Sequence, residues 1–146
     1  MNVYELLKKD HREVKQLFKQ IEETSSRAEK KRTELFEKLK KELIAHSKAE
    51  EKAFYSRLKK EDETKEDTLE AVEEHHVVDV LLKELSSMPV TSDEWMAKFS
   101  VLKENVMHHV KEEEEELFKE AKEVISGEEA EEVGEEVEKQ KKKYLS

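Results

Sequence analysis

The chain has 146 residues, enough for one domain, and its 38 acidic residues outnumber its 28 basic residues to give a net charge of −10. This charge argues against nucleic acid or an anionic membrane surface as the main partner, because both require a cationic face. Cysteine is absent, which excludes disulfides, thiol catalysis, iron–sulfur clusters and thiolate metal sites. Any metal must therefore be held by His, Asp or Glu.

The sequence also lacks the features of membrane and secreted proteins. No stretch approaches the roughly 18 apolar residues of a membrane span, and the first residues, Met-Asn-Val-Tyr-Glu, do not form a basic and then apolar secretory signal. With two glycines and one proline, the chain contains no glycine-rich phosphate-binding motif. We therefore expect a cytoplasmic protein without nucleotide chemistry of that kind.

Polar breaks divide the chain into four long helices and a short fifth one. The breaks fall at residues 22–30, 59–66, 86–93 and 126–128. Thr91 with Glu94, and Ser126 with Glu129, have the Ser/Thr-x-x-Glu spacing that satisfies free amides where a helix begins. We predict helices over residues 2–22, 29–58, 65–86, 92–125 and 128–143.

Apolar residues recur every three or four positions in each of the four long helices, as Val3, Leu7, Val14 and Phe18 do in the first. Amphipathic helices with short connections form antiparallel bundles. We therefore predict an all-α protein, an up-down-up-down four-helix bundle over residues 1–125. Residues 126–146 are expected to form a C-terminal helical extension along the outside.

Histidine positions reveal an internal repeat. His11 and His75 are each followed by apolar residues at the same four offsets, and His46 and His109 are each followed four residues later by a glutamate. The two histidines of the first half are 35 residues apart, and those of the second half are 34 apart. The bundle therefore reads as two copies of one helical hairpin.

The four histidines lie on the apolar stripes of their helices, and Glu50 and Glu113 follow one turn later on the same stripes. A single core histidine is usually only a hydrogen-bonded polar residue, but six polar residues at repeated offsets favour a shared site. Each buried carboxylate would cost on the order of several kcal/mol without a compensating charge, and no Lys or Arg shares these stripes at this level. The pattern predicts a dinuclear metal site, whose nitrogen and oxygen ligands suit iron, manganese or zinc.

The repeat also suggests how the ligands divide between two metals. His11 and His46 would hold one ion, His75 and His109 the other, and Glu50 and Glu113 would bridge them. Each ion would then keep an open coordination position, which indicates reactivity with a small exogenous ligand. No general acid or base besides the ligands is identifiable, so we assign no catalytic residue.

Several residues near these ligands are expected to lie outside the site. His76 and His108 are rotated by about 100° from the adjacent ligands and should point away from the metals. The Glu112–Glu116 run more than circles a helix, and the repeat selects Glu113 as its inward member. Glu116 could accept a hydrogen bond from a ligand or reach solvent. Tyr4 and Tyr55 could each contribute a hydroxyl beside the ligands or serve only in core packing.

Four segments together resemble the hemerythrin-like, HHE cation-binding family. They are Asp10-His11-Arg12-Glu13-Val14, His46-Ser47-Lys48-Ala49-Glu50-Glu51, Glu74-His75 with Val78, and His109-Val110-Lys111-Glu112-Glu113. The resemblance runs from about residue 3 to residue 125. It implies an antiparallel four-helix bundle with two iron ions in a non-haem di-iron centre that binds dioxygen or related species.

The chain departs from the oxygen-carrying members of that family in two places. They have a second histidine one turn after the third ligand, where this chain has Asp79, and they end with H-x-x-x-x-D instead of His109-x-x-x-Glu113. The expected function is binding of O2, peroxide or NO, with small molecules as the partners. A peroxide- or NO-consuming enzyme and an iron or oxygen sensor or metal-handling protein are the alternatives, and the sequence does not decide whether Asp79 is a ligand.

Overall fold

The computed structural model describes all residues from 1 to 146, and every regular element in it is helical. In chain order the elements are α1 (Val3–Glu22), α2 (Glu29–Glu50), η1 (Glu51–Tyr55), α3 (Ser56–Leu58), α4 (Asp62–Ser86), α5 (Asp93–Glu112), η2 (Glu113–Leu117), α6 (Phe118–Val124) and α7 (Gly127–Leu145). The elements η1 and η2 are single wide π-helical turns. Because α2, η1 and α3 follow one another without a break, as do α5, η2 and α6, the chain forms four long rods and a fifth helix.

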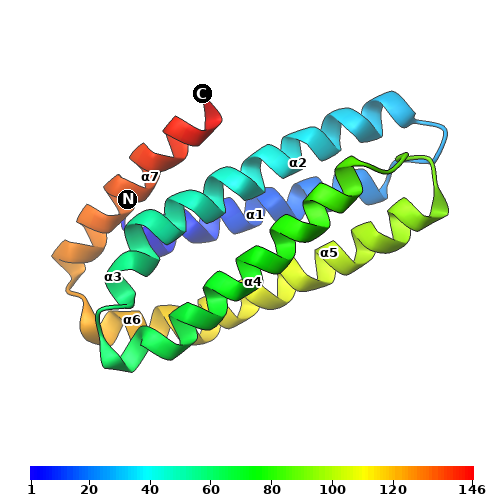
Figure 1. Cartoon of the computed structure of the whole chain (residues 1–146). Coiled ribbons are helices and arrows are strands. Elements are labelled where there is room, and N and C mark those ends of the chain that lie inside the picture. The colour runs from blue at the N-terminus through cyan, green and yellow to red at the C-terminus, as the bar shows by residue number, and fades with distance from the viewer.

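The four rods lie side by side in antiparallel order, and α7 runs along α1 and α2 (Figure 1). The predicted all-α, up-down-up-down bundle with an additional C-terminal helix is thus confirmed. The helix expected over residues 65–86 begins earlier, at Asp62, where two acidic residues occupy its first turn. None of the helices combines the length and the apolarity that a membrane span requires.

One of the two predicted helix caps is wrong. Ser126 caps α7 as predicted, because its hydroxyl accepts a hydrogen bond from the Glu129 backbone amide. The cap of α5 is Ser92 and not Thr91, since the Ser92 hydroxyl accepts the Trp95 amide at 3.1 Å. Two neighbouring hydroxyl residues made the motif ambiguous, and Ser92 has the extended backbone that is typical of a cap.

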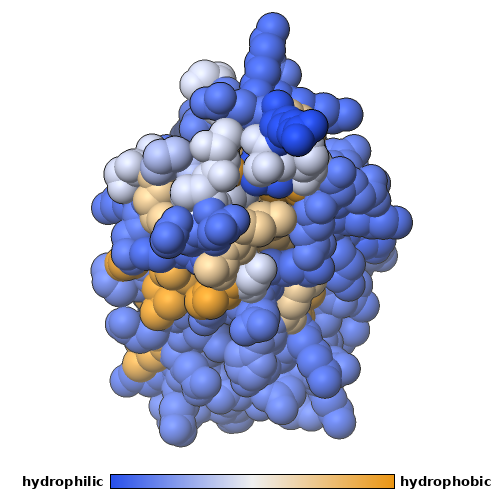
Figure 2. Space-filling model, turned by 90° about the vertical axis from the view of Figure 1, so that its right-hand side faces the viewer, coloured by the Kyte–Doolittle hydropathy of each residue, from blue (hydrophilic) through white to orange (hydrophobic).

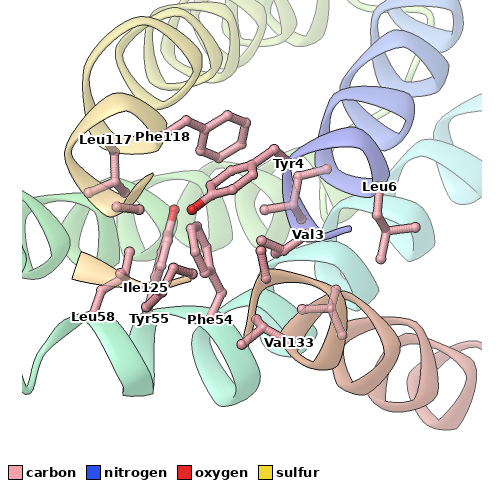
Figure 3. Packing of buried hydrophobic residues seen from close by; sticks show 14 of the residues in the cluster. Val3, Tyr4, Leu6, Phe54, Tyr55, Leu58, Leu117, Phe118, Ile125 and Val133 are labelled. Carbon is pink, nitrogen blue, oxygen red and sulfur yellow. The ribbon is translucent and has the colours of Figure 1, made fainter. Parts of the chain in front are cut away.

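The apolar core consists of two separate clusters, one toward each end of the bundle. The first contains residues from α1, η1, α6 and α7, and Figure 3 shows Val133 of α7 beside Val3 of α1 in this cluster. The second fills the end that carries the α1–α2 and α4–α5 connections. Figure 2 looks onto that end, where hydrophilic side chains surround a small apolar area. The four histidines lie at the level between the two clusters.

Helix α7 packs so closely on the N-terminus that its inner face requires a glycine. A Cβ atom built on Gly134 would lie 2.4 Å from the Met1 carbonyl oxygen and 2.8 Å from backbone atoms of Asn2 and Val3. Gly127, at the start of the same helix, has nothing within 4 Å of such an atom.

We expect Gly134→Ala to destabilise the protein by about 1–3 kcal/mol, the usual effect of overpacking against atoms that have little room to move. Gly127→Ala is the matched control, and it should be neutral or stabilise α7 by up to about 1 kcal/mol because alanine favours helix. Urea unfolding followed by circular dichroism measures both. Equal stability of the two variants would contradict the close packing of α7.

Candidate metal centre

Four buried histidines meet in the middle of the bundle, one from each long rod. His11 comes from α1, His46 from α2, His75 from α4 and His109 from α5, and their exposed fractions are only 4–6%. The ring centroids of His11 and His46 are 5.1 Å apart, and those of His75 and His109 are 4.7 Å apart. The histidines therefore form two pairs, and each pair belongs to one helical hairpin.

Two glutamates join these pairs from the inside. Glu50 Oε1 lies 3.4 Å from His46 Nε2 and 3.2 Å from His75 Nε2. Glu113 approaches His11 Nε2 at 3.2 Å through Oε1 and His109 Nε2 at 3.6 Å through Oε2. The structure thus brings all six predicted ligands together, with each carboxylate reaching one histidine of each pair.

Several inward-facing atoms of this cluster have no hydrogen-bond partner. They are Nε2 of His11, both carboxylate oxygens of Glu50 and Oε1 of Glu113. Glu50 is fully buried and Glu113 is 2% exposed, so water does not solvate these charges freely. Buried polar atoms are almost always paired, and four imidazoles with two carboxylates form a typical donor set for first-row transition metals. The residues therefore fit a pair of metal ions.

A ring of four further carboxylates fixes the outer side of each histidine. Each accepts or shares a proton at the histidine Nδ1 atom, over distances of 2.6–2.8 Å. The pairs are Glu114 with His11, Asp10 with His46, Glu51 with His75 and Glu74 with His109. Such contacts fix each ring with Nε2 facing inward and favour the neutral tautomer with its proton on Nδ1, which makes Nε2 a more basic metal ligand.

The sequence analysis did not identify these four carboxylates, although the repeat contains their signal. Asp10 and Glu74 each precede one of the four buried histidines by one residue, and Glu51 and Glu114 each follow one of the two buried glutamates by one residue. In a chain with 38 acidic residues, adjacency to a ligand means little by itself. Only the matching positions in both halves distinguish them from the solvated acidic residues.

Comparison with known proteins agrees with this geometry. The family model described as the hemerythrin HHE cation binding domain matches residues 2–121. The chain belongs to the hemerythrin HHE cation-binding family. The crystal structure of a hemerythrin HHE cation binding domain-containing protein from Mycobacterium kansasii superposes with a TM-score of 0.87 at 29% identity, covering 99% of this chain and 88% of that one.

A curated relative, described as a DNA nickase from a Nostoc species, is 29% identical over 131 residues. The match covers 90% of this chain but 36% of the Nostoc protein, so this chain spans about a third of its length. A nuclease activity of the longer protein is therefore not assigned to this hemerythrin-like domain.

Tyr55 belongs to the centre of this hemerythrin-like domain and not only to its packing. Its hydroxyl donates to Glu113 Oε2 and lies 3.3 Å from His109 Nε2, while its ring stacks on His75. The repeat-related residue is Phe118, which stacks on His11 but has no hydroxyl. Burial and the nearby Glu113 and Glu50 raise the pKa of Tyr55 well above its ordinary value, so the phenol stays protonated.

Each of the two buried glutamates of the cluster lies at a wide π-helical turn. The turn η1 begins one residue after Glu50, and η2 begins at Glu113 itself. Two successive large side chains are buried at the end of each turn, Phe54 with Tyr55 in η1, and Leu117 of η2 with Phe118, the first residue of α6. Single π-helical turns are frequent at functional sites, and here each lies between a buried glutamate and an aromatic ring that stacks on a histidine.

The neighbours that the sequence placed away from the centre are at its periphery. His76 is exposed, and the exposed His108 pairs with Glu112 at 2.9 Å. The Asp79 carboxylate lies 3.7 Å from Lys48 Nζ. Asp79 belongs to neither of the two groups of potential metal ligands in which the four buried histidines occur. Glu116 is exposed, and the buried Tyr4 hydroxyl has no hydrogen-bond partner.

Without metal, protons stabilise the cluster. Burial favours a lower pKa for His46, but the carboxylates of Glu50 and Asp10 outweigh it and raise the pKa to about 10. The pKa of His109 is likewise raised well above its ordinary value by Glu113 and Glu74, against the effect of burial. His46 and His109 therefore stay protonated beside these carboxylates in the metal-free protein, and metal ions must displace their protons.

The metal-free protein should lose stability as the pH rises from about 6.5 to about 10. The folded-state pKa of His46 is raised above its ordinary value of 6.5, so its contribution is complete below that value and is lost as the pH passes about 10. Metal-loaded protein should show the opposite trend at acidic pH, because ligation requires neutral imidazole. Melting temperatures of the metal-free form from pH 6.5 to about 10, and of the metal-loaded form at acidic pH, test the prediction, which fails if the metal-free form becomes more stable toward pH 10.

Proposed function

We propose that this domain is a non-haem di-iron protein that binds O2 or a related small ligand such as NO or peroxide. His11 and His46 would hold one iron ion, and His75 and His109 the other. Glu50 and Glu113 would bridge the two ions, since each carboxylate already reaches a histidine of both pairs. The nitrogen and oxygen donor set also suits manganese or zinc.

An apolar pocket beside the histidines is the observation that carries this proposal. The pocket is lined by all four histidines, by Ser47 and by the aliphatic residues Val14, Leu43, Val78, Val106 and Val110. Aliphatic walls admit a small uncharged molecule and disfavour ions, because an ion would lose its hydration without gaining polar partners. A diatomic gas has the size and polarity that this pocket accepts.

The protein's own groups prepare the centre for such a ligand. The outer carboxylates hold the histidine Nε2 atoms inward, and Tyr55 fixes Glu113 through its hydroxyl proton. The aliphatic residues of the pocket keep water away from the histidine faces. Bound iron would supply a redox-active Lewis acid with a coordination position open to the small ligand.

The position of Asp79 favours a second candidate, a peroxide- or NO-consuming enzyme. The oxygen-carrying hemerythrins have a further histidine at this position. In this chain the position is Asp79, whose carboxylate pairs with Lys48 near the surface. The centre would then have fewer protein ligands and more open positions, which favours turnover over long-lived storage. A sensor or metal-handling role is a further outcome that the experiments below distinguish.

Replacing one ligand histidine should remove metal and leave an unpaired buried carboxylate. We expect His46→Ala or His109→Ala to lower the iron content by about one ion per chain and to destabilise the metal-treated protein. His76→Ala is the matched control, because His76 is an exposed neighbour of a ligand. Elemental analysis with thermal unfolding measures both effects, and equal metal loss in the control would contradict the ligand assignment.

Anaerobic reduction of the iron-loaded protein followed by O2 titration tests the proposed function. An absorption band that appears with O2 and disappears on deoxygenation would support reversible binding. Irreversible bleaching with consumption of many equivalents of peroxide or NO would support the enzyme instead. Stable iron with no response to any of these ligands would leave the sensor or metal-handling reading.

The same titration tests the apolar pocket directly. Val106→Leu places an extra methylene in the pocket and should weaken O2 binding about tenfold, the order of effect expected for one misfitting methylene, while iron content is unchanged. Val101→Leu is the control, because Val101 lies on the same helix but is 46% exposed. Identical O2 affinities in the two variants would show that this pocket is not where the ligand binds.

A further inference from the structure

An acidic groove between α4 and the α5–η2 rod leads from the surface to the metal centre. Five carboxylates line it, from Asp67, Glu70, Glu74, Glu112 and Glu116. The inner end is formed by two of the proposed ligands, His109 and Glu113. Glu113 is 2% exposed, and its Oε1 atom, which lies 3.2 Å from His11 Nε2, has no hydrogen-bond partner, so the buried anion at the inner end of the groove also belongs to the centre.

The other half of the repeat provides an internal comparison, because it contains the equivalent groove between α1 and the α2–η1 rod. By the histidine offsets, Asp67 and Glu70 correspond to Val3 and Leu6, and Glu112 and Glu116 correspond to Ala49 and Ala53. Those apolar residues belong to the first core cluster or pack against it, and α7 covers them with Val133 and Val137. One groove is therefore closed and apolar, whereas its counterpart is open and acidic.

The charges of the two grooves are also balanced differently. On the closed side, Asp10 is 4% exposed and its carboxylate lies 2.7 Å from Lys141 Nζ of α7. On the open side, the corresponding Glu74 pairs with His109, and Glu112 pairs with His108. No lysine or arginine forms an ion pair with the five groove carboxylates, and Asp67, Glu70 and Glu116 have no ion-pair partner at all, so the negative charge of these three is left for a mobile cation.

Asp67 of the groove also lies close to Glu120, and burial together with this neighbouring carboxylate raises the pKa of Glu120 to about 7. At the surface beside the groove, donor atoms of Glu74, His108 and Glu112 lie within 4.8 Å of one another, a spacing at which they could hold a cation in transit.

We propose that the α4–α5 groove is the access route by which divalent cations reach the buried centre. The inference rests on the proposed metal centre and adds the path that fills it. The carboxylates attract the hydrated cation, the Glu74, His108 and Glu112 group replaces part of its water, and Glu113 receives it at the inner end. Because α7 closes the related groove, loading occurs from one side of the bundle only.

Stopped-flow mixing of metal-free protein with Co2+ tests this route, because the visible absorption of cobalt reports its arrival at the histidines. The test variant is Glu70→Gln/Glu116→Gln, which alters two exposed groove residues that are not ligands. The control is Glu13→Gln/Glu104→Gln, which removes the same charge from exposed positions outside the groove. A second test variant, Glu116→Lys, reverses one charge in the groove.

Both groove variants should take up Co2+ roughly fivefold to tenfold more slowly than the control. This factor is at the lower end of the rate increases that electrostatic steering produces. The final metal content should equal that of the wild type, and the rate difference should nearly vanish at about 1 M salt, where charges are screened within about 3 Å. Equal rates for the groove and control variants would overturn the access route while leaving the metal centre intact. A wild type that takes up no Co2+, iron or manganese would overturn the metal centre and the route together.

Discussion

The structure depends on the burial of two glutamates, Glu50 and Glu113, in the middle of a narrow helical bundle. A buried carboxylate without a compensating cation costs on the order of several kcal/mol, and these two lie among four imidazoles with unpartnered oxygens. The surrounding residues are arranged around these two carboxylates. Four helices each contribute a histidine, and four outer carboxylates orient those histidines. A π-helical turn lies between each glutamate and the ring that stacks on a histidine, Tyr55 in one half and Phe118 in the other.

The two halves of the repeat share this scaffold but differ in what surrounds it. In the first half, α7 covers the α1–α2 groove and its Lys141 neutralises Asp10, the most deeply buried of the four outer carboxylates. In the second half, no helix covers the acidic α4–α5 groove. The aliphatic pocket on the histidine faces is a third environment. The bundle thus combines a closed side, an acidic side suited to cations and an apolar pocket suited to a small neutral ligand.

The helices and the six central residues could be predicted from the sequence, because the apolar period is local and the positions of the histidines and glutamates are repeated in both halves. The apolar period gave the helices to within a few residues, and the shared offsets of the histidines and glutamates singled out the six residues that the structure brings together. The outer carboxylates were missed because acidic residues are abundant and only tertiary contact separates Glu51 or Glu74 from solvated neighbours. The contact of Lys141 with Asp10 spans 131 residues, and no local pattern encodes it.

A crystal structure of the iron-loaded protein, with anomalous diffraction recorded at the iron edge, tests the central claim most directly. The account predicts two peaks between the helices, one beside His11 and His46 and the other beside His75 and His109, with Glu50 and Glu113 in contact with both. A single peak, or iron bound only at the surface group of Glu74, His108 and Glu112, would contradict a dinuclear centre bridged by the two buried glutamates.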